Sequence, residues 1–137
     1  MPVCAATRRS HFNAAHRLHN PARPDDWNAA TFGLCNNPHF HGHNYELDVT
    51  VEGPIDQETG YVLDLGVLAD VVEERIIKRL DHRNLNVEVE WFADLNPTVE
   101  NIAVVIWREL RAALPESLVL RVRLWETPRN YVEYEGG

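Results

Sequence analysis

Alternation of apolar and polar residues predicts four β-strands. Between residues 43 and 51, odd-numbered positions are His, Tyr, Leu, Val and Val, whereas even-numbered positions are polar. Because successive side chains of a strand point to opposite faces, this pattern is typical of a strand with one buried face. We predict strands over residues 3–16, 43–53, 118–126 and 131–134, the last following a turn at Pro128. The third predicted strand carries one face of Leu118, Leu120, Val122, Leu124 and Glu126.

Two stretches have the apolar spacing of amphipathic helices. The first covers residues 65–79, with Asp64 as the N-cap, and its predicted buried stripe contains Leu65, Leu68, Ala69, Val72, Ile76 and Leu80. The second begins after Pro97, with Asn96 or Thr98 as the cap, and ends before Pro115. Residues 17–40 are predicted to form a long functional loop. The stretch from about residue 81 to Asn96 is predicted to be irregular.

The predicted order is strand, strand, helix, helix, strand, strand. Runs of like elements favour an α+β fold, so we expect a four-stranded antiparallel sheet with two helices packed on one face. The length of 137 residues is that of a single domain, 1–137. A four-stranded open sheet has two unpaired edges, which must be covered or paired with another chain.

Composition and charge narrow the classes of function. The chain has a net charge of -8, which argues against non-specific binding to nucleic acid and leaves any recognition of phosphate to local groups. It contains no long apolar run and no start that resembles a signal peptide, so we expect a cytoplasmic protein with no membrane association. The two cysteines, Cys4 and Cys35, suit a reducing compartment.

Three histidines form a candidate metal site. His41 and His43 are two residues apart and therefore share one face of a strand, and His16 shares a face with Phe12 and Ala14. If the two strands pair, the three imidazoles converge and leave one tetrahedral position open, which is typical of catalytic zinc. The alternative is that His41 and His43 are ordinary surface histidines.

Six blocks of sequence, in order, resemble the 6-pyruvoyl-tetrahydropterin synthase family, which includes the bacterial 6-carboxytetrahydropterin synthases. The blocks are Phe12-x-Ala-Ala-His16-x-Leu, Phe32-Gly-x-Cys35-Asn-Asn-Pro, His41-Gly-His43-Asn-Tyr, Leu80-Asp-His82-x-x-Leu-Asn86, Pro97-Thr-x-Glu-Asn101 and Glu126-Thr127. They span nearly the whole chain. The spacing from Cys35 to His41 matches the pyruvoyl-type members, whereas His39-Phe40 stands where animal members usually have Asn-Gly.

The resemblance implies a fold, an assembly and a reaction. The fold would be the tunnelling fold (T-fold), in which three subunits join their sheets into one barrel. Two such barrels would stack into a homo-hexamer, a dimer of trimers with active sites at the subunit interfaces. The substrate would be 7,8-dihydroneopterin triphosphate, and a zinc-dependent carbon–oxygen lyase would eliminate triphosphate from it.

The resemblance also assigns catalytic roles to Cys35, Asp81, His82 and Glu126. Cys35 would be the base, since a nearby metal or imidazolium lowers the pKa of a thiol; the alternative is a buried, inert cysteine. Asp81 and His82 would form a relay pair, although the residues alone favour a polar helix end, where a histidine meets the helix dipole favourably.

Glu126 would anchor the pterin ring, because a carboxylate on an apolar strand face needs hydrogen-bond donors and a pterin offers two adjacent ones. The alternative is a solvated strand end beside Pro128. Thr98 and Glu100 match family positions near the pterin, and both also suit the first turn of a helix. The remaining histidines, His11, His19 and His39, are expected to be structural or exposed. Four arginines could contact a triphosphate, but the sequence does not favour one over another, and an exposed surface role is expected for each: Arg17, Arg23, Arg83 and Arg129.

The leading hypothesis is therefore a 6-pyruvoyl-tetrahydropterin synthase activity. The first alternative is a 6-carboxy-5,6,7,8-tetrahydropterin synthase of the queuosine (7-deazaguanine) pathway, which uses the same substrate but loses side-chain carbons. An alternative of another class is a non-catalytic, zinc-stabilised assembly module, in which a protein group would fill the fourth metal position.

Overall fold

Two long antiparallel strands form the centre of the molecule. The computed structural model describes all 137 residues, and its strands β1 (Val3–His16) and β2 (His41–Pro54) pair along their full length. The register places His16 opposite His41 and Ala14 opposite His43. Strand β2 begins two residues before the predicted start, so both histidines of the His-x-His motif lie within it.

The sheet has five strands in the order β3-β1-β2-β4-β5. Strand β4 (Val119–Thr127) pairs with β2, and β5 (Asn130–Tyr134) pairs with β4. Both pairings are antiparallel, as predicted. The prediction of four antiparallel strands was wrong at the other edge, where β3 (Arg83–Asn84) pairs in parallel with β1 at Ala14 and Ala15. A strand of two residues is too short to produce an alternating pattern.

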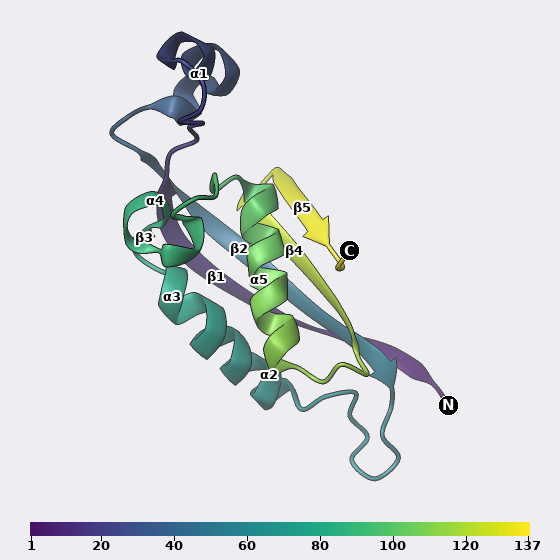
Figure 1. Cartoon of the computed structure of the whole chain (residues 1–137). Coiled ribbons are helices and arrows are strands. Elements are labelled where there is room, and N and C mark those ends of the chain that lie inside the picture. The colour runs from purple at the N-terminus through teal and green to yellow at the C-terminus, as the bar shows by residue number, and fades with distance from the viewer.

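Helices cover one face of this sheet (Figure 1). The first predicted helix consists of α2 (Leu65–Val72), the π-helical turn η2 (Glu73–Ile77) and α3 (Lys78–Leu80), and the second is α5 (Val99–Ala113). As predicted, Asp64 caps α2 by accepting a hydrogen bond from the Gly66 N–H, and Thr98 caps α5 by accepting one from Asn101. No helix is long and apolar enough to cross a membrane.

The apolar core lies between these helices and the sheet. The fully buried strand residues include Phe12, Tyr45, Leu47, Val49 and Leu124, so the predicted inward face is confirmed. The predicted stripe of the first helix was wrong at Leu65, which is exposed, whereas Ile77 is buried beside Ile76. Both isoleucines face the core because the π-turn holds more residues than an α-helical turn.

Residues 17–40, predicted as a loop, contain the helix α1 (Asp25–Phe32) and the 3-10 turn η1 (Gly33–Asn36). This excursion extends beyond the end of the sheet where β1 stops and β2 begins (Figure 1). Further short elements, α4 (Leu85–Glu88) and η3 (Glu90–Phe92), occupy the segment predicted to be irregular. The pairing of β1 and β2 thus brings the excursion to the same end of the sheet as the three histidines.

Candidate metal centre and active site

The three candidate ligands converge at one end of the β1–β2 ladder. His16, His41 and His43 each offer one ring nitrogen, and these nitrogens all lie within 4.8 Å of one another. Their ring centroids are 4.5–5.1 Å apart. The cause is the strand geometry that the sequence predicts, because each imidazole points to the face that also carries Phe12 and Tyr45.

One hydrogen bond sets the orientation of His16. Its Nδ1 lies 2.8 Å from the carbonyl oxygen of Pro97, in the segment before α5. Since a carbonyl only accepts hydrogen bonds, Nδ1 carries the proton and Nε2 carries the free lone pair. A backbone carbonyl that fixes the tautomer in this way is the usual support of a metal-binding histidine.

Several buried ring nitrogens have no protein partner, namely His16 Nε2, His43 Nε2 and both nitrogens of His41. Buried polar atoms in native proteins are almost always satisfied, so such a cluster needs a ligand. Burial also lowers the pKa of His16 to about 4, and it lowers the pKa of His41. Neutral imidazoles at neutral pH are the form that binds a metal ion.

The donor set fits zinc with one open position. Three histidines without a fourth protein ligand are typical of catalytic zinc, whereas structural sites have four. Neither Cys35 nor Glu126 belongs to the group of converging ligand atoms. The arrangement therefore leaves room for water or a substrate oxygen at the metal.

Glu126 lies beside the histidines. Its Oε2 is 4.0 Å from His16 Nε2, and its side chain is 25% exposed. The β4–β5 ladder is irregular between Trp125 and Thr127, the position of Glu126. Together with His43 and Trp125, Glu126 lines a cavity of about 590 Å³. A carboxylate at a cavity wall next to a metal-binding cluster is placed to accept hydrogen bonds from a ligand.

Cys35 is half-buried, in η1 at the end of the excursion. Its carbonyl oxygen accepts a hydrogen bond of 2.8 Å from the Leu18 N–H, two residues after His16. The prediction that Cys35 lies in a loop was wrong, because the last turn of the excursion is helical and is bonded to the chain that follows His16.

Asp81 and His82 are in direct contact, with Asp81 Oδ2 3.0 Å from His82 Nδ1. Neighbours in sequence can meet in this way because the backbone bends at His82, which has a left-handed conformation with φ of 62°. Asp81 Oδ1 also accepts a hydrogen bond from the Asn13 N–H, and that bond is the largest cause of its lowered pKa. The His82 side chain is 82% exposed, so within one chain the pair does not join the three histidines.

Thr98 and Glu100 lie in the first turn of α5. The Thr98 hydroxyl is engaged as the helix cap, and Glu100 is exposed and forms no ion pair. His11 and His39 are exposed as expected, and His39 donates its N–H to Asn37 Oδ1. Three of the four arginines considered as triphosphate contacts have protein partners. Arg23 stacks on the Trp27 ring, Arg83 Nη1 lies 3.9 Å from Glu88 Oε2, and Arg17 Nε donates to the Asn36 carbonyl.

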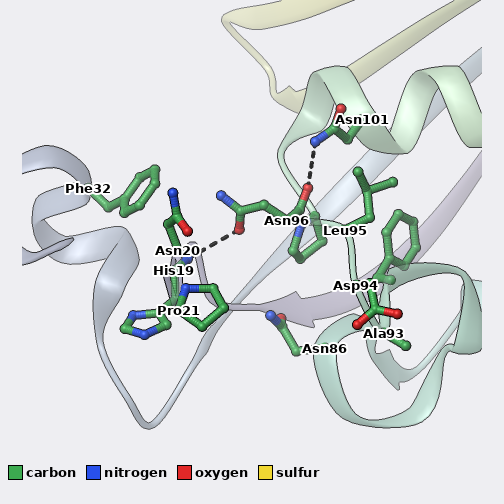
Figure 2. A pocket seen from close by; sticks show the side chains of 12 residues that line it. His19, Asn20, Pro21, Phe32, Asn86, Ala93, Asp94, Leu95, Asn96 and Asn101 are labelled. Atoms are coloured by element: carbon green, nitrogen blue, oxygen red, sulfur yellow. Dashed lines mark hydrogen bonds between the residues drawn. The ribbon is translucent and has the colours of Figure 1, made fainter. Parts of the chain in front are cut away.

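Sequence reasoning missed the groups that support these side chains. The carbonyl of Pro97 has no signature in the sequence, because every residue has a carbonyl. A second pocket, of about 550 Å³, lies between the excursion and the segment before α5 and is lined by Asn20, Asn86, Asn96 and Asn101 (Figure 2). The only available signal was the presence of these asparagines, of which Asn86 and Asn101 lie in the matched blocks.

The comparisons with known proteins agree with this geometry. Residues 5–137 match the family model described as 6-pyruvoyl tetrahydropterin synthase. The chain is 48% identical over 136 residues to the 6-pyruvoyl tetrahydrobiopterin synthase of Drosophila melanogaster, covering 98% of this chain and 81% of the relative. It is 46% identical over 130 residues to the Homo sapiens protein of the same name, covering 95% and 90%.

The structure of the Caenorhabditis elegans 6-pyruvoyl tetrahydropterin synthase superposes with a TM-score of 0.94. The two sequences are 38% identical, and the match covers 100% of this chain and 98% of that one. The α+β architecture with helices on one face of the sheet is thus that of a tunnelling fold. On the matched blocks, the converging histidines and these comparisons, the chain belongs to the 6-pyruvoyl tetrahydropterin synthase family.

Proposed function

We propose that this protein is a zinc-dependent 6-pyruvoyl-tetrahydropterin synthase, a carbon–oxygen lyase that eliminates triphosphate from 7,8-dihydroneopterin triphosphate. The observation that carries the proposal is the set of buried, unpartnered ring nitrogens of His16, His41 and His43. The Drosophila melanogaster and Homo sapiens relatives, 48% and 46% identical, are both named 6-pyruvoyl tetrahydrobiopterin synthase.

The chain supplies binding and proton transfer. Glu126 accepts paired hydrogen bonds from the ring N–H and the exocyclic amine of the pterin, while Thr98 and Glu100 lie near the bound substrate. His16, His41 and His43 would hold the zinc, which would supply Lewis-acid chemistry that makes the side-chain oxygens of the substrate and the adjacent C–H more acidic. The Cys35 thiolate then moves protons between the side-chain carbons, with help from His82 oriented by Asp81. No redox cofactor is needed, because oxidation at one carbon is matched by reduction at its neighbour.

The exposure of His82 supports an active site shared between subunits. A catalytic histidine that is 82% exposed in one chain is available to a neighbouring copy. We propose a homo-hexamer, a dimer of trimers, in which the Asp81–His82 pair of one subunit reaches the histidine cluster of another. The short edge strand β3, beside Asp81 and His82, and the edge strand β5 are the sheet edges that such an assembly would cover.

Product analysis tests the proposed reaction. Purified protein and 7,8-dihydroneopterin triphosphate should yield inorganic triphosphate and a product with the mass of 6-pyruvoyl-tetrahydropterin. A product that has lost side-chain carbons would instead support the 6-carboxy-tetrahydropterin synthase. Unchanged substrate, together with a metal site closed by a fourth protein ligand, would support the assembly module.

A further inference from the structure

The hydrogen bonding of β1 continues for two residues after the strand ends at His16. Asn86 holds both backbone groups of Arg17: its Oδ1 accepts from the Arg17 N–H at 2.8 Å, and its Nδ2 donates to the Arg17 carbonyl at 2.9 Å. A side-chain amide thus replaces a neighbouring strand, on the side where β3 pairs with β1. The backbone that follows His16 is therefore fixed from one side.

The dipeptide Cys35–Asn36 bonds both backbone groups of Leu18, the residue after Arg17. The Leu18 N–H donates to the Cys35 carbonyl at 2.8 Å, and the Leu18 carbonyl accepts from Asn36 Nδ2 at 2.8 Å. The Arg17 Nε donates to the Asn36 carbonyl at 2.8 Å. Three hydrogen bonds therefore tie Cys35–Asn36 to the two residues after His16.

The Asn36 side chain makes a second contact. Its Nδ2 lies 3.0 Å from His19 Nδ1, and an amide nitrogen only donates, so His19 accepts at this atom. His19 is held in turn by Asn96, whose Oδ1 accepts from the His19 N–H, and Asn96 is held by Asn101 (Figure 2). Asn96 precedes Pro97, the residue whose carbonyl orients His16.

We propose that Asn36 and Arg17 are positioning residues that hold the Cys35 thiol at a fixed place relative to the three histidines. The inference rests on the proposed function, in which Cys35 is the base. It assigns Arg17 to this contact rather than to the triphosphate. It also gives a role to the three hydrogen bonds that tie Cys35–Asn36, at the end of the excursion, to the two residues after His16.

The test measures Cys35 reactivity without substrate, in a Cys4→Ser background that leaves a single thiol. In the chain with native Asn36, zinc bound to the nearby histidines should accelerate alkylation of Cys35 by iodoacetamide at neutral pH, since a nearby metal lowers the pKa of a thiol. In Asn36→Ala the zinc effect should disappear, while zinc binding is retained. Asn37→Ala is the matched control, because Asn37 is the exposed neighbour and its side chain bonds only the His39 N–H.

Steady-state kinetics give a second readout. Misplacement of a reacting group by about 1 Å can cost about 100-fold in rate. In Asn36→Ala, kcat should therefore fall about 10- to 100-fold with little change in KM, whereas Asn37→Ala should keep both. Asn36→Asp, which keeps the side-chain shape but removes both donors, should behave as Asn36→Ala does.

Two results would overturn the positioning role. One is that zinc changes the rate of Cys35 alkylation equally in Asn36→Ala, Asn36→Asp and the parent chain. This result includes the case in which zinc changes the rate in none of the three proteins. The other is loss of zinc binding and folding in both Asn36 variants, which would make the role structural. A parent chain that releases no triphosphate would refute the proposed function instead, and the alkylation result would still stand.

Discussion

The carbonyl oxygen of Pro97 lies 2.8 Å from Nδ1 of His16. This contact joins the segment before α5 to the end of β1, and it leaves His16 Nε2 facing His41 and His43 with no protein partner. A backbone acceptor thus decides which nitrogen of His16 is available to a metal. The Tyr45 hydroxyl also lies 3.4 Å from His16 Nδ1.

The first prediction concerns pH and the metal-free protein. The pKa of His16 is lowered to about 4, mainly by burial, against 6.5 for an exposed histidine. Because the unfolded chain takes up this proton at a higher pH than the folded chain, His16 should reduce stability as pH falls from 6.5 to 4. The loss should reach about 3 kcal/mol. It is measured as the difference in unfolding free energy between the wild-type chain and His16→Gln across that range.

Imidazole nitrogen shifts in NMR provide the direct check of the same prediction. His16 should remain neutral at pH 5 with Nδ1 protonated, while exposed His11 serves as the internal reference. Protonation of the His16 ring near pH 6.5 would contradict the burial of that ring.

The second prediction concerns the metal ligands. His41→Ala removes one of three converging nitrogens, so zinc content and activity should be lost together. The helices should remain, because the apolar core beneath α2 and α5 is untouched, and circular dichroism should be unchanged. His39→Ala is the matched control, two residues upstream and exposed. Full zinc content in His41→Ala would place the metal elsewhere.

The third prediction concerns Glu126. Glu126→Gln keeps the shape of the side chain but replaces one acceptor with a donor, so one hydrogen bond to the pterin ring is lost. A charge-assisted bond is worth about 1.5–3 kcal/mol, which corresponds to about 10- to 150-fold in affinity. Calorimetry should show pterin binding weakened at least about tenfold with zinc content unchanged. Unaltered affinity would mean that another residue anchors the ring.

The fourth prediction concerns assembly. If Cys35 and His82 act on the same substrate from different subunits, inactive Cys35→Ala and inactive His82→Ala chains should regain activity when mixed into one oligomer. Some interfaces then contain an intact Cys35 and an intact His82. Sedimentation should show a hexamer. Proven mixed oligomers that stay inactive, or a stable monomer with full activity, would argue against shared sites.

Much of the site could be predicted because it follows from strand geometry. The two-residue period placed His16, His41 and His43 on one face, and the caps Asp64 and Thr98 follow from local hydrogen bonding. The helix α1 was not predicted, because Asn28 is its only buried residue and it has no apolar stripe. The strand β3 and the π-turn at Glu73–Ile77 depend on tertiary contacts rather than on a sequence period.

The hydrogen bonds that support the site could not be predicted from the sequence either. Asn86 and Asn36 bond backbone groups of Arg17 and Leu18, and Asn36 also bonds the ring of His19, but the same asparagines would suit an exposed turn. Their role follows only from the way the excursion and β3 meet the end of β1. The backbone partner of such a bond can be any residue, and here the partners are up to 69 residues apart in the sequence, so only the structure reveals them.

The most direct test of the central claim is a zinc titration of the metal-free protein. Triphosphate release from 7,8-dihydroneopterin triphosphate is measured after each addition, together with the zinc bound to the chain. Activity should rise in proportion to bound zinc and stop rising at one equivalent per chain. X-ray absorption at that point should show three nitrogen ligands at about 2.0–2.1 Å and one exchangeable position. Full activity in the metal-free protein, or a fourth ligand from Cys35 or Glu126 that substrate does not displace, would contradict the account.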